Sequence, residues 1–192
     1  MAQPATKAKG IHVRPGRWTV QRALAELPET NDVIIEVIDG SLLVSPRGGS
    51  DHASALRDLA YLMHRAAKRV GFTMLPGVNL VVGEELPIPD AIVVRHDGSR
   101  KVWFDASDVV LVVEIMSPST RRLDRIVRPR IYADGGIPHY LRVEFRGEDP
   151  VMLLHELVDG EYRPVVVAAA GTTFTMHEPF EFAIDPAELL DT

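Results

Sequence analysis

The chain has 192 residues, of which 46% are hydrophobic, and it carries a net charge of −6. This size fits one compact domain, and we predict a single domain over residues 1–192, with residues 1–15 as a flexible segment. The polar start of the chain contains no apolar stretch of the kind that a secretory signal or membrane anchor needs, which indicates a cytoplasmic protein without membrane association. Because cysteine is absent, disulfides, zinc-thiolate sites and cysteine nucleophiles are excluded, and a bound metal would need carboxylates, carbonyls or histidines.

The first half of the chain predicts a hairpin followed by a helix. Residues 33–45 hold two aliphatic runs joined at Asp39-Gly40, a pair suited to the positive φ angles of a tight turn. Between Ser50 and Gly71 the apolar residues recur at helical spacing, with Ser50 or Asp51 as the cap and Gly71 as the stop; they are Leu56, Leu59, Ala60, Met63, Ala67 and Val70.

The second half predicts a central strand, a helix and further strands. Residues 109–116 read VVLVVEIM, which is typical of a strand buried on both faces, and shorter strands are expected over 78–82 and 89–94. A polar helix follows, with Ser117, Ser119 or Thr120 as its cap, a kink expected at Pro129 and a stop at 134–136. Strands over 139–145, 151–157 and 162–168 and a helical turn over 186–191 complete a mixed sheet flanked by helices, of α/β or α+β class. Asp97-Gly98 and Asp159-Gly160 are expected at turns.

Two acids stand at strand positions where the pattern calls for hydrophobic residues. Alternation along a strand places Glu114 on one side with Val110 and Val112. Asp90 shares a side with Ile92 and Val94 in the same way. A buried carboxylate costs several kcal/mol unless a cation or hydrogen-bond donors meet it. If the two strands are neighbours, both acids can converge on one Mg²⁺ ion and leave room for water and a phosphate.

The residues after the central strand favour a phosphate site. Asp124, Arg128 and Tyr132 are spaced by four and share one helical face, while Arg121 and Arg125 lie beside it. The amino end of this helix would favour an anion. Two other interpretations remain open: the acids could pair with arginines in a structural ion network, and the arginine run could be a solvated helix face. The chain has no HExxH, Walker, GxGxxG or GxSxG motif, so zinc-protease, nucleotide-cofactor and acyl-serine chemistry are not indicated.

Two stretches closely resemble the Uma-two family of restriction endonucleases in the PD-(D/E)xK nuclease superfamily. They are PDAIVV at 89–94 and VVLVVEIMSPSTRRLDRIVRPRIYADGGIPHYLRVE at 109–144. The hairpin EVIDGSLLVSP and the helix that begins near His52 also look like the N-terminal half of that family. The likeness runs from about residue 30 to about residue 145 and implies a restriction-endonuclease-like fold with an N-terminal hairpin.

The resemblance also implies roles for individual residues. Asp90 and Glu114 would be metal ligands, together with the carbonyl of Ile115, and Asp124 and Arg128 would stand near the site. Glu36 matches a family acid in the hairpin, although a solvated strand glutamate is an equal alternative. The lysine that the superfamily usually has two residues after the glutamate is Met116 here, and Arg128 stands where the family usually has a lysine. Arginine keeps its charge and cannot act as a base, so it could bind the phosphate while the metal activates water.

These inferences give a hypothesis and two alternatives. The hypothesis is a Mg²⁺- or Mn²⁺-dependent endonuclease that hydrolyses phosphodiester bonds in DNA, with Arg121 and Arg125 on the phosphates and Glu36 and Tyr132 as accessory residues. A homodimer would suit the cutting of two strands. The first alternative is a catalytically inactive nuclease fold that binds nucleic acid or a protein, and the second is a structural domain with no affinity for metal.

Overall fold

A computed structural model of the chain describes residues 16–28, 32–95, 101–117, 121–147 and 149–189. Three expectations fall outside these ranges: the flexible segment 1–15, the turn at Asp97-Gly98 and the helix caps within 118–120. In the described residues, no helix is long and apolar enough to cross a membrane.

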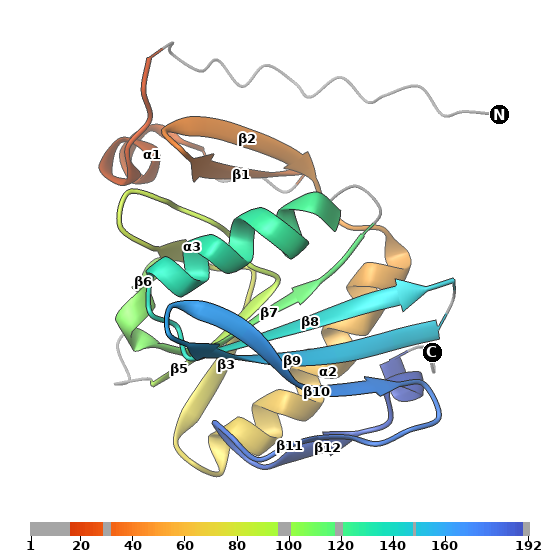
Figure 1. Cartoon of the computed structure of the whole chain (residues 1–192). Helices are drawn as coiled ribbons and strands as arrows, with labels where there is room; N and C mark the ends of the chain where they lie inside the picture. Colours follow the sequence, from red (N-terminus) through yellow and green to blue (C-terminus); the bar gives the residue numbers. More distant parts are fainter. Residues whose placement is uncertain (1–15, 29–31, 96–100, 118–120, 148, 190–192) are drawn as a thin grey trace, which may run out of the picture.

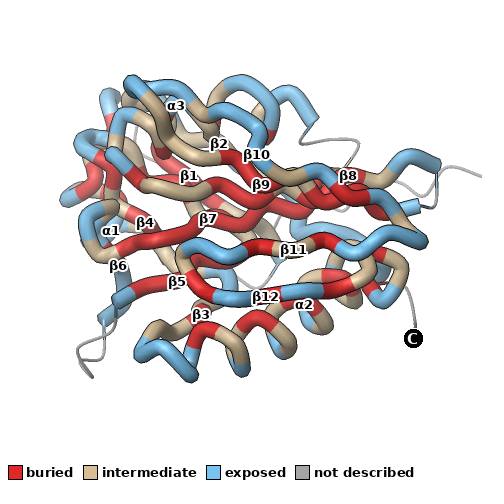
Figure 2. The backbone as a smooth tube through the Cα atoms, turned by 60° about the horizontal axis from the view of Figure 1, so that its bottom comes forward, coloured by how far each residue is buried: buried red, intermediate tan, exposed pale blue. Residues whose placement is uncertain are grey.

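A six-stranded mixed sheet forms the centre of the structure, in the order β10-β9-β8-β7-β5-β3 (Figure 1). β7 and β8 run parallel and the other neighbours are antiparallel. The strands of this sheet are β3 (Phe72–Pro76), β5 (Ala91–Arg95), β7 (Val109–Ile115), β8 (His139–Arg146), β9 (Asp149–Val158) and β10 (Glu161–Ala169). Every residue of β7 is buried (Figure 2), which confirms the predicted central strand.

In the described ranges, three two-stranded sheets and the helices complete the fold. The small sheets pair β1 (Val33–Ile38) with β2 (Ser41–Pro46), β4 (Asn79–Val81) with β6 (Trp103–Asp105), and β11 (Phe174–Met176) with β12 (Phe182–Ile184). The helices are α1 (Val20–Glu26), α2 (Ser50–Lys68) and α3 (Arg128–Asp134). Short helical turns are η1 (Ala106–Asp108), η2 (Leu123–Val127), which is π-helical, and η3 (Pro186–Leu189).

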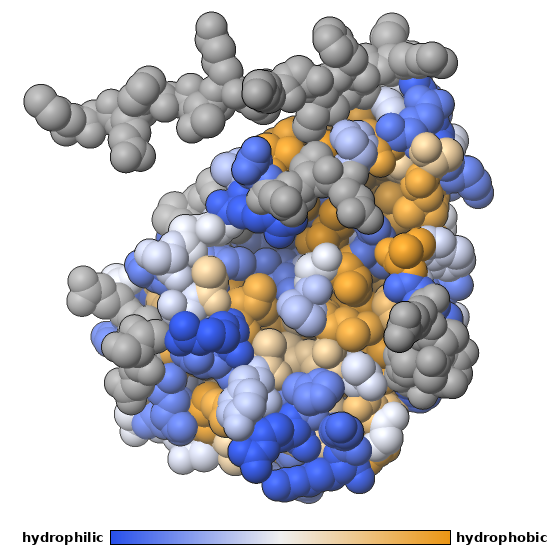
Figure 3. Space-filling model, turned by 180° about the vertical axis from the view of Figure 1, so that it is seen from behind, coloured by the Kyte–Doolittle hydropathy of each residue, from blue (hydrophilic) through white to orange (hydrophobic). Residues whose placement is uncertain are grey.

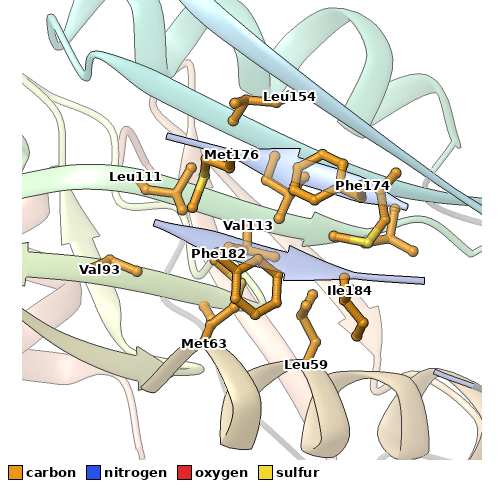
Figure 4. Close-up of a cluster of buried hydrophobic side chains, with 14 of the residues drawn as sticks. Leu59, Met63, Val93, Leu111, Val113, Leu154, Phe174, Met176, Phe182 and Ile184 are labelled. Atoms are coloured by element: carbon orange, nitrogen blue, oxygen red, sulfur yellow. The ribbon is translucent and has the colours of Figure 1, made fainter. Parts of the chain in front are cut away.

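The larger hydrophobic core lies between the sheet, α2 and the β11-β12 pair. Burial of large apolar side chains of this kind contributes roughly 1.5–3 kcal/mol each. Figure 4 shows side chains from these elements meeting in one cluster, among them Leu59, Met63, Val93, Leu111, Val113, Leu154, Phe174, Met176, Phe182 and Ile184. Hydrophilic side chains gather along the outward face of α2 (Figure 3), as expected for an amphipathic helix.

The second core lies on the opposite face of the sheet, beneath α3. Val109 and Val112 of β7 both belong to it, whereas Val110 belongs to the core on the α2 side. The predicted alternation, which grouped Val110 with Val112, was therefore wrong at this point. The reason is a register shift between β5 and β7 at Val93/Val94, since a bulge changes which side chains share a face.

The N-terminal hairpin β1-β2 lies on the α3 side of the sheet (Figure 1). Its turn is at Asp39-Gly40, with φ angles of 51° and 67°, as predicted. Trp18 and residues of α1 pack against Val37 and Leu86 in a third small core. A backbone pairing between Val37 and Leu86 then ties the hairpin to the segment before β5.

The predicted helices are present, with two differences of detail. α2 begins at Ser50 with Gly49 as its N-cap, so neither Ser50 nor Asp51 caps it, and Val70 lies beyond its end and is 54% exposed. The second helix contains the π-helical turn η2 directly before α3, whose first turn holds Pro129. Proline lacks an amide hydrogen and clashes with the carbonyl four residues earlier, so a regular α-helical turn directly before Pro129 is disfavoured.

Candidate active site

The ends of two neighbouring strands bring the predicted acids together. Ala91 pairs with Val113 in the antiparallel β5-β7 ladder, so Asp90 and Glu114 lie next along the two strands. The side chain of Asp90 crosses to β7, where its Oδ2 accepts a hydrogen bond of 2.7 Å from the amide of Ile115. Asp90 is thus tied to the backbone of Ile115, the residue whose carbonyl was the third predicted ligand, and Glu114 is the residue directly before it.

Glu114 is completely buried and has two internal partners. Its Oε1 accepts a hydrogen bond from the hydroxyl of Tyr132, and its Oε2 lies 3.2 Å from Arg128 Nη1. Burial raises the pKa of Glu114 well above its ordinary value, and the charges of Asp90 and Asp124 raise it further, although Arg128 acts in the opposite direction. This carboxyl group therefore holds its proton more strongly than a surface glutamate.

Arg128 lies among three carboxylates, each from a different element. Nη1 contacts Asp124 Oδ1 at 2.7 Å as well as Glu114, and Nη2 contacts both oxygens of Glu36 at 2.9 and 2.8 Å. Glu36 also accepts a hydrogen bond from the amide of Ile88. The Glu36 side chain is fully buried, which rules out the solvated strand glutamate that the sequence left open. The guanidinium group carries a single positive charge, fewer than the number of acidic groups that surround it.

His52, in the first turn of α2, is a second group that contacts the Asp90 carboxylate, beside the Ile115 amide. Its Nε2 lies 3.1 Å from Asp90 Oδ1, and its ring also bonds to the backbone of Ile115. The hydrogen bond to Asp90 raises the pKa of His52, although burial alone would lower it. Sequence reasoning did not assign His52 to the site, because a histidine early in an amphipathic helix has no metal-binding pattern of its own.

A cleft of about 860 Å³ opens beside these residues, between the start of α2 and the ends of β7 and β8. The residues that line it are Gly49, Ser50, Asp51, His52, Met116, Ser117, Arg121, Arg125, Glu144, Phe145, Arg146 and Gly147. Both arginines predicted to contact phosphate therefore face this cleft, and Arg146 adds a third guanidinium.

Glu144 of β8 forms ion pairs with two arginines at the cleft. Its carboxylate pairs with Arg125 and lies 2.7 Å from Arg142 Nε, with 6% of its side chain exposed. Although burial raises the pKa of Glu144, the hydrogen bond from Arg125 and the charge of Arg142 lower it below its ordinary value overall. A faint signal for this pair is present in the sequence, since Arg142 and Glu144 occupy alternate positions of β8 and are flanked there by Leu141, Val143 and Phe145.

The predicted ligands are carboxylates and a backbone carbonyl, which are the kinds of group that hard divalent cations prefer. Its present partners are internal: Arg128 and Tyr132 hold Glu114, while His52 and the Ile115 amide hold Asp90. Within the described ranges, no group of three or more acidic or histidine side chains is placed to hold an ion. Metal binding would therefore require these carboxylates to exchange some of their internal partners.

Comparisons with known proteins identify the fold and the family. A solved structure titled "Crystal structure of a putative nuclease belonging to DUF820 from Anabaena variabilis ATCC 29413" aligns with a TM-score of 0.73 at 15% identity, over 91% of this chain and 98% of that chain. No curated protein matches the chain. The model of the Uma2 family, described as "Putative restriction endonuclease", matches residues 22–187. The resemblance seen in the sequence is confirmed over a longer range, and the chain belongs to the Uma2 family of nucleases with a restriction-endonuclease-like fold.

Proposed function

We propose that the protein is a metal-dependent endonuclease that hydrolyses phosphodiester bonds in DNA. One observation carries the proposal: the Asp90 carboxylate and the Ile115 backbone meet beside Glu114, at the edge of a cleft lined by three arginines. An acidic centre that adjoins a basic cleft suits a phosphodiester, since the cleft would bind the backbone and the centre would act on it.

Asp90, Glu114 and the carbonyl of Ile115 are the groups that would hold Mg²⁺ or Mn²⁺. When bound, such an ion polarises a phosphodiester and lowers the pKa of a water ligand. His52 keeps the Asp90 side chain and the Ile115 backbone in place. Tyr132 orients Glu114 by donating to Oε1, and Asp124 and Arg128 set the charge around it.

The cleft would receive the backbone of the nucleic acid. Arg121 and Arg125 come from the helical segment before α3, and Arg146 comes from the end of β8. The opposite wall is the amino end of α2, a helix of 19 residues whose N-cap makes no side-chain hydrogen bond. Exposed amide groups at such a helix end attract anions, and together with the guanidinium groups they favour phosphate.

The test is cleavage of supercoiled plasmid DNA with Mg²⁺ or Mn²⁺ by the parent protein, Asp90→Asn and the control Glu161→Gln, which changes an exposed acid on β10. We expect nicking by the parent and the control and its loss in Asp90→Asn. Equal nicking by all three proteins would show that the activity does not come from this site. Calorimetric titration with Mn²⁺ of the parent and of Glu114→Ala examines the ligands directly, and equal binding by both would remove Glu114 from the set.

A binding module without catalysis is the second candidate, and specific observations favour it. Met116 occupies the usual lysine position and is buried, and both terminal nitrogens of Arg128 are held by carboxylates. A basic catalytic side chain is therefore missing from both places. In this case the parent would retain DNA in a gel-shift assay without cutting it, and Arg128→Lys would not restore cleavage. Restored cleavage in Arg128→Lys would favour the nuclease instead.

Two broader expectations remain predictions. We also propose that the protein is cytoplasmic and that it forms a homodimer, which would present two sites to the two strands of DNA. Sedimentation equilibrium would give the oligomeric state, and a monomer that nicks DNA one strand at a time would contradict the dimer.

A further inference from the structure

The cleft beside the acidic centre has the volume of a pocket for a small molecule. It measures about 860 Å³, and pockets of about 300–1,000 Å³ usually enclose one ligand of drug size. About one or two nucleotides have this size, whereas a turn of duplex DNA, whose major groove alone is about 12 Å wide, is far larger. A duplex would therefore lie across the rim of the cleft, and an unpaired strand would fit inside it.

The acids of the proposed centre lie behind the lining of this cleft. Glu114 is fully buried, and the side chain of Asp90 is 16% exposed. His52, which contacts Asp90, and Met116, which comes two positions after Glu114, both line the cleft. A phosphate group in the cleft would have to be brought inward past these side chains to reach the acids. A single strand bends to do so more readily than a duplex, which is stiff.

The charges along the cleft also suit a short strand better than a duplex. Apart from His52, the described lining carries three positive and two negative side chains, a net charge of +1; they are Arg121, Arg125, Arg146, Asp51 and Glu144. Proteins whose duplex binding depends strongly on salt neutralise on the order of 6–10 phosphates with lysine and arginine. Three arginines can contact about three phosphates. Another kind of contact has to add to the affinity.

Phe145 is placed to make that contact. It is partly buried against the larger core, and it lines the cleft between its β8 neighbours Glu144 and Arg146. Met116 adds a second apolar side chain to the lining. Aromatic rings beside cationic groups are a general means of binding single-stranded nucleic acid, because bases stack on the ring while the cations hold the phosphates. The bases of a duplex already stack on one another, so Phe145 offers a duplex little.

We propose that the cleft binds a single-stranded segment of DNA, with one base stacked on Phe145 and the adjoining phosphates on Arg121 and Arg146. The substrate would be an unpaired strand, a tail or a locally opened duplex, and an intact duplex would be a poor one. The proposal rests on the proposed function, since the strand held here is the strand to be cut, but the binding step needs no metal ion. Phe145 is then a specificity-determining residue, because stacking selects unpaired bases.

The test is fluorescence anisotropy in EDTA with one labelled oligonucleotide of mixed sequence. It is presented as a single strand, as a blunt duplex and as the unpaired tail of a duplex. We expect the single strand and the tail to bind at least about tenfold more tightly than the blunt duplex. Equal affinity for the single strand and the blunt duplex would overturn the proposal.

Two matched variants examine the role of the ring. Phe145→Leu removes the ring and keeps an apolar side chain against the core, and it should weaken binding of the single strand by roughly 5- to 150-fold, the effect of losing one base–aromatic stack. The control is Phe72→Leu on β3, which changes a partly buried phenylalanine of the same core outside the cleft lining and should bind as the parent does. Unchanged binding by Phe145→Leu, or an equal loss in the control, would overturn the proposal.

A third variant covers the case in which circular dichroism shows that Phe145→Leu does not fold. Phe145→Trp keeps an aromatic face and introduces a fluorescent reporter at the same position. A base stacked on the indole ring should quench its emission, measured as the difference from the parent, when the single strand is added. Equal quenching by the blunt duplex, or no quenching by the single strand, would overturn the proposal.

Cleavage assays separate this proposal from the proposed function. Preference for the single strand, with no cleavage of any DNA in Mn²⁺, would support the binding mode and refute the nuclease. Plasmid cleavage that Asp90→Asn abolishes, together with equal binding of single strand and duplex, would support the nuclease and overturn the single-stranded substrate. Cleavage of the blunt duplex as fast as the tailed duplex would overturn it as well.

Discussion

The buried carboxyl group of Glu114 should make the protein less stable as the pH rises. In the unfolded chain this group titrates near the ordinary glutamate pKa, about 4.3. In the folded protein burial raises its pKa well above that value, and Asp90 and Asp124 add to the effect. Folding therefore takes up a proton at any pH between the two pKa values. The favourable contribution is complete below the unfolded pKa and is lost as the pH rises through the folded pKa.

The size of the effect follows from linkage. One proton bound only by the folded state changes the free energy of unfolding by up to about 1.4 kcal/mol per pH unit. Glu114→Gln removes the titrating group. Its amide can still bond to Tyr132 and Arg128, which hold the carboxyl oxygens now. The stability of the variant relative to the parent should therefore increase by up to about 1.4 kcal/mol for each pH unit above the unfolded pKa, until the pH reaches the raised pKa of the folded protein.

Urea denaturation followed by circular dichroism at several pH values in this range measures the difference. Glu161→Gln serves as the control, because it neutralises an exposed acid on β10 and should follow the parent at every pH. A difference between Glu114→Gln and the parent that stays constant with pH would refute the reasoning. It would mean that Glu114 is ionised throughout, as a surface glutamate is.

Two further predictions concern the surroundings of the site. Tyr140→Phe removes the hydroxyl that donates a 2.7 Å hydrogen bond to the Asp124 carbonyl, so the free energy of unfolding should fall by about 1–3 kcal/mol in urea denaturation; an unchanged value would mean that this bond does not hold the π-helical turn. Arg125→Ala should weaken DNA binding and reduce the slope of log affinity against log salt by about one. Arg130→Ala is its control, and equal slopes for the two variants would remove Arg125 from the phosphate contacts.

Local patterns were sufficient to predict most of the elements around the site. Asp39-Gly40 predicted the hairpin, the apolar spacing from Leu59 to Ala67 predicted α2, and the unbroken aliphatic run predicted β7 as the central strand. Each of these signals depends on neighbours in the sequence. β3 was not predicted, since its five residues FTMLP end in a proline and show no clear alternation, and it owes its structure to pairing with β5.

The two acids at the site were predicted because a charge on a buried strand is conspicuous. Their partners were not, since each partner comes from a distant element. Asp90 contacts His52 because the first turn of α2 lies near the end of β7. The way in which the helix crosses the sheet sets this contact, and neither segment alone reveals it. The bulge between β5 and β7 likewise turns the Val110 side chain to the other face of the sheet. A bulge depends on how two strands pair, and the sequence of one strand does not identify its partner.

Arg128 shows where reasoning from the sequence alone stops. Its spacing from Asp124 and Tyr132 on one helical face was visible, and it indicated a phosphate-binding arginine. The decisive contact is with Glu36, which is 92 positions away and belongs to a hairpin outside the central sheet. An arginine turned toward a phosphate and one enclosed by three acids have the same local sequence. Only the packing of the hairpin beside α3 distinguishes them, and that packing changes the expected role from contact with the substrate to internal charge balance.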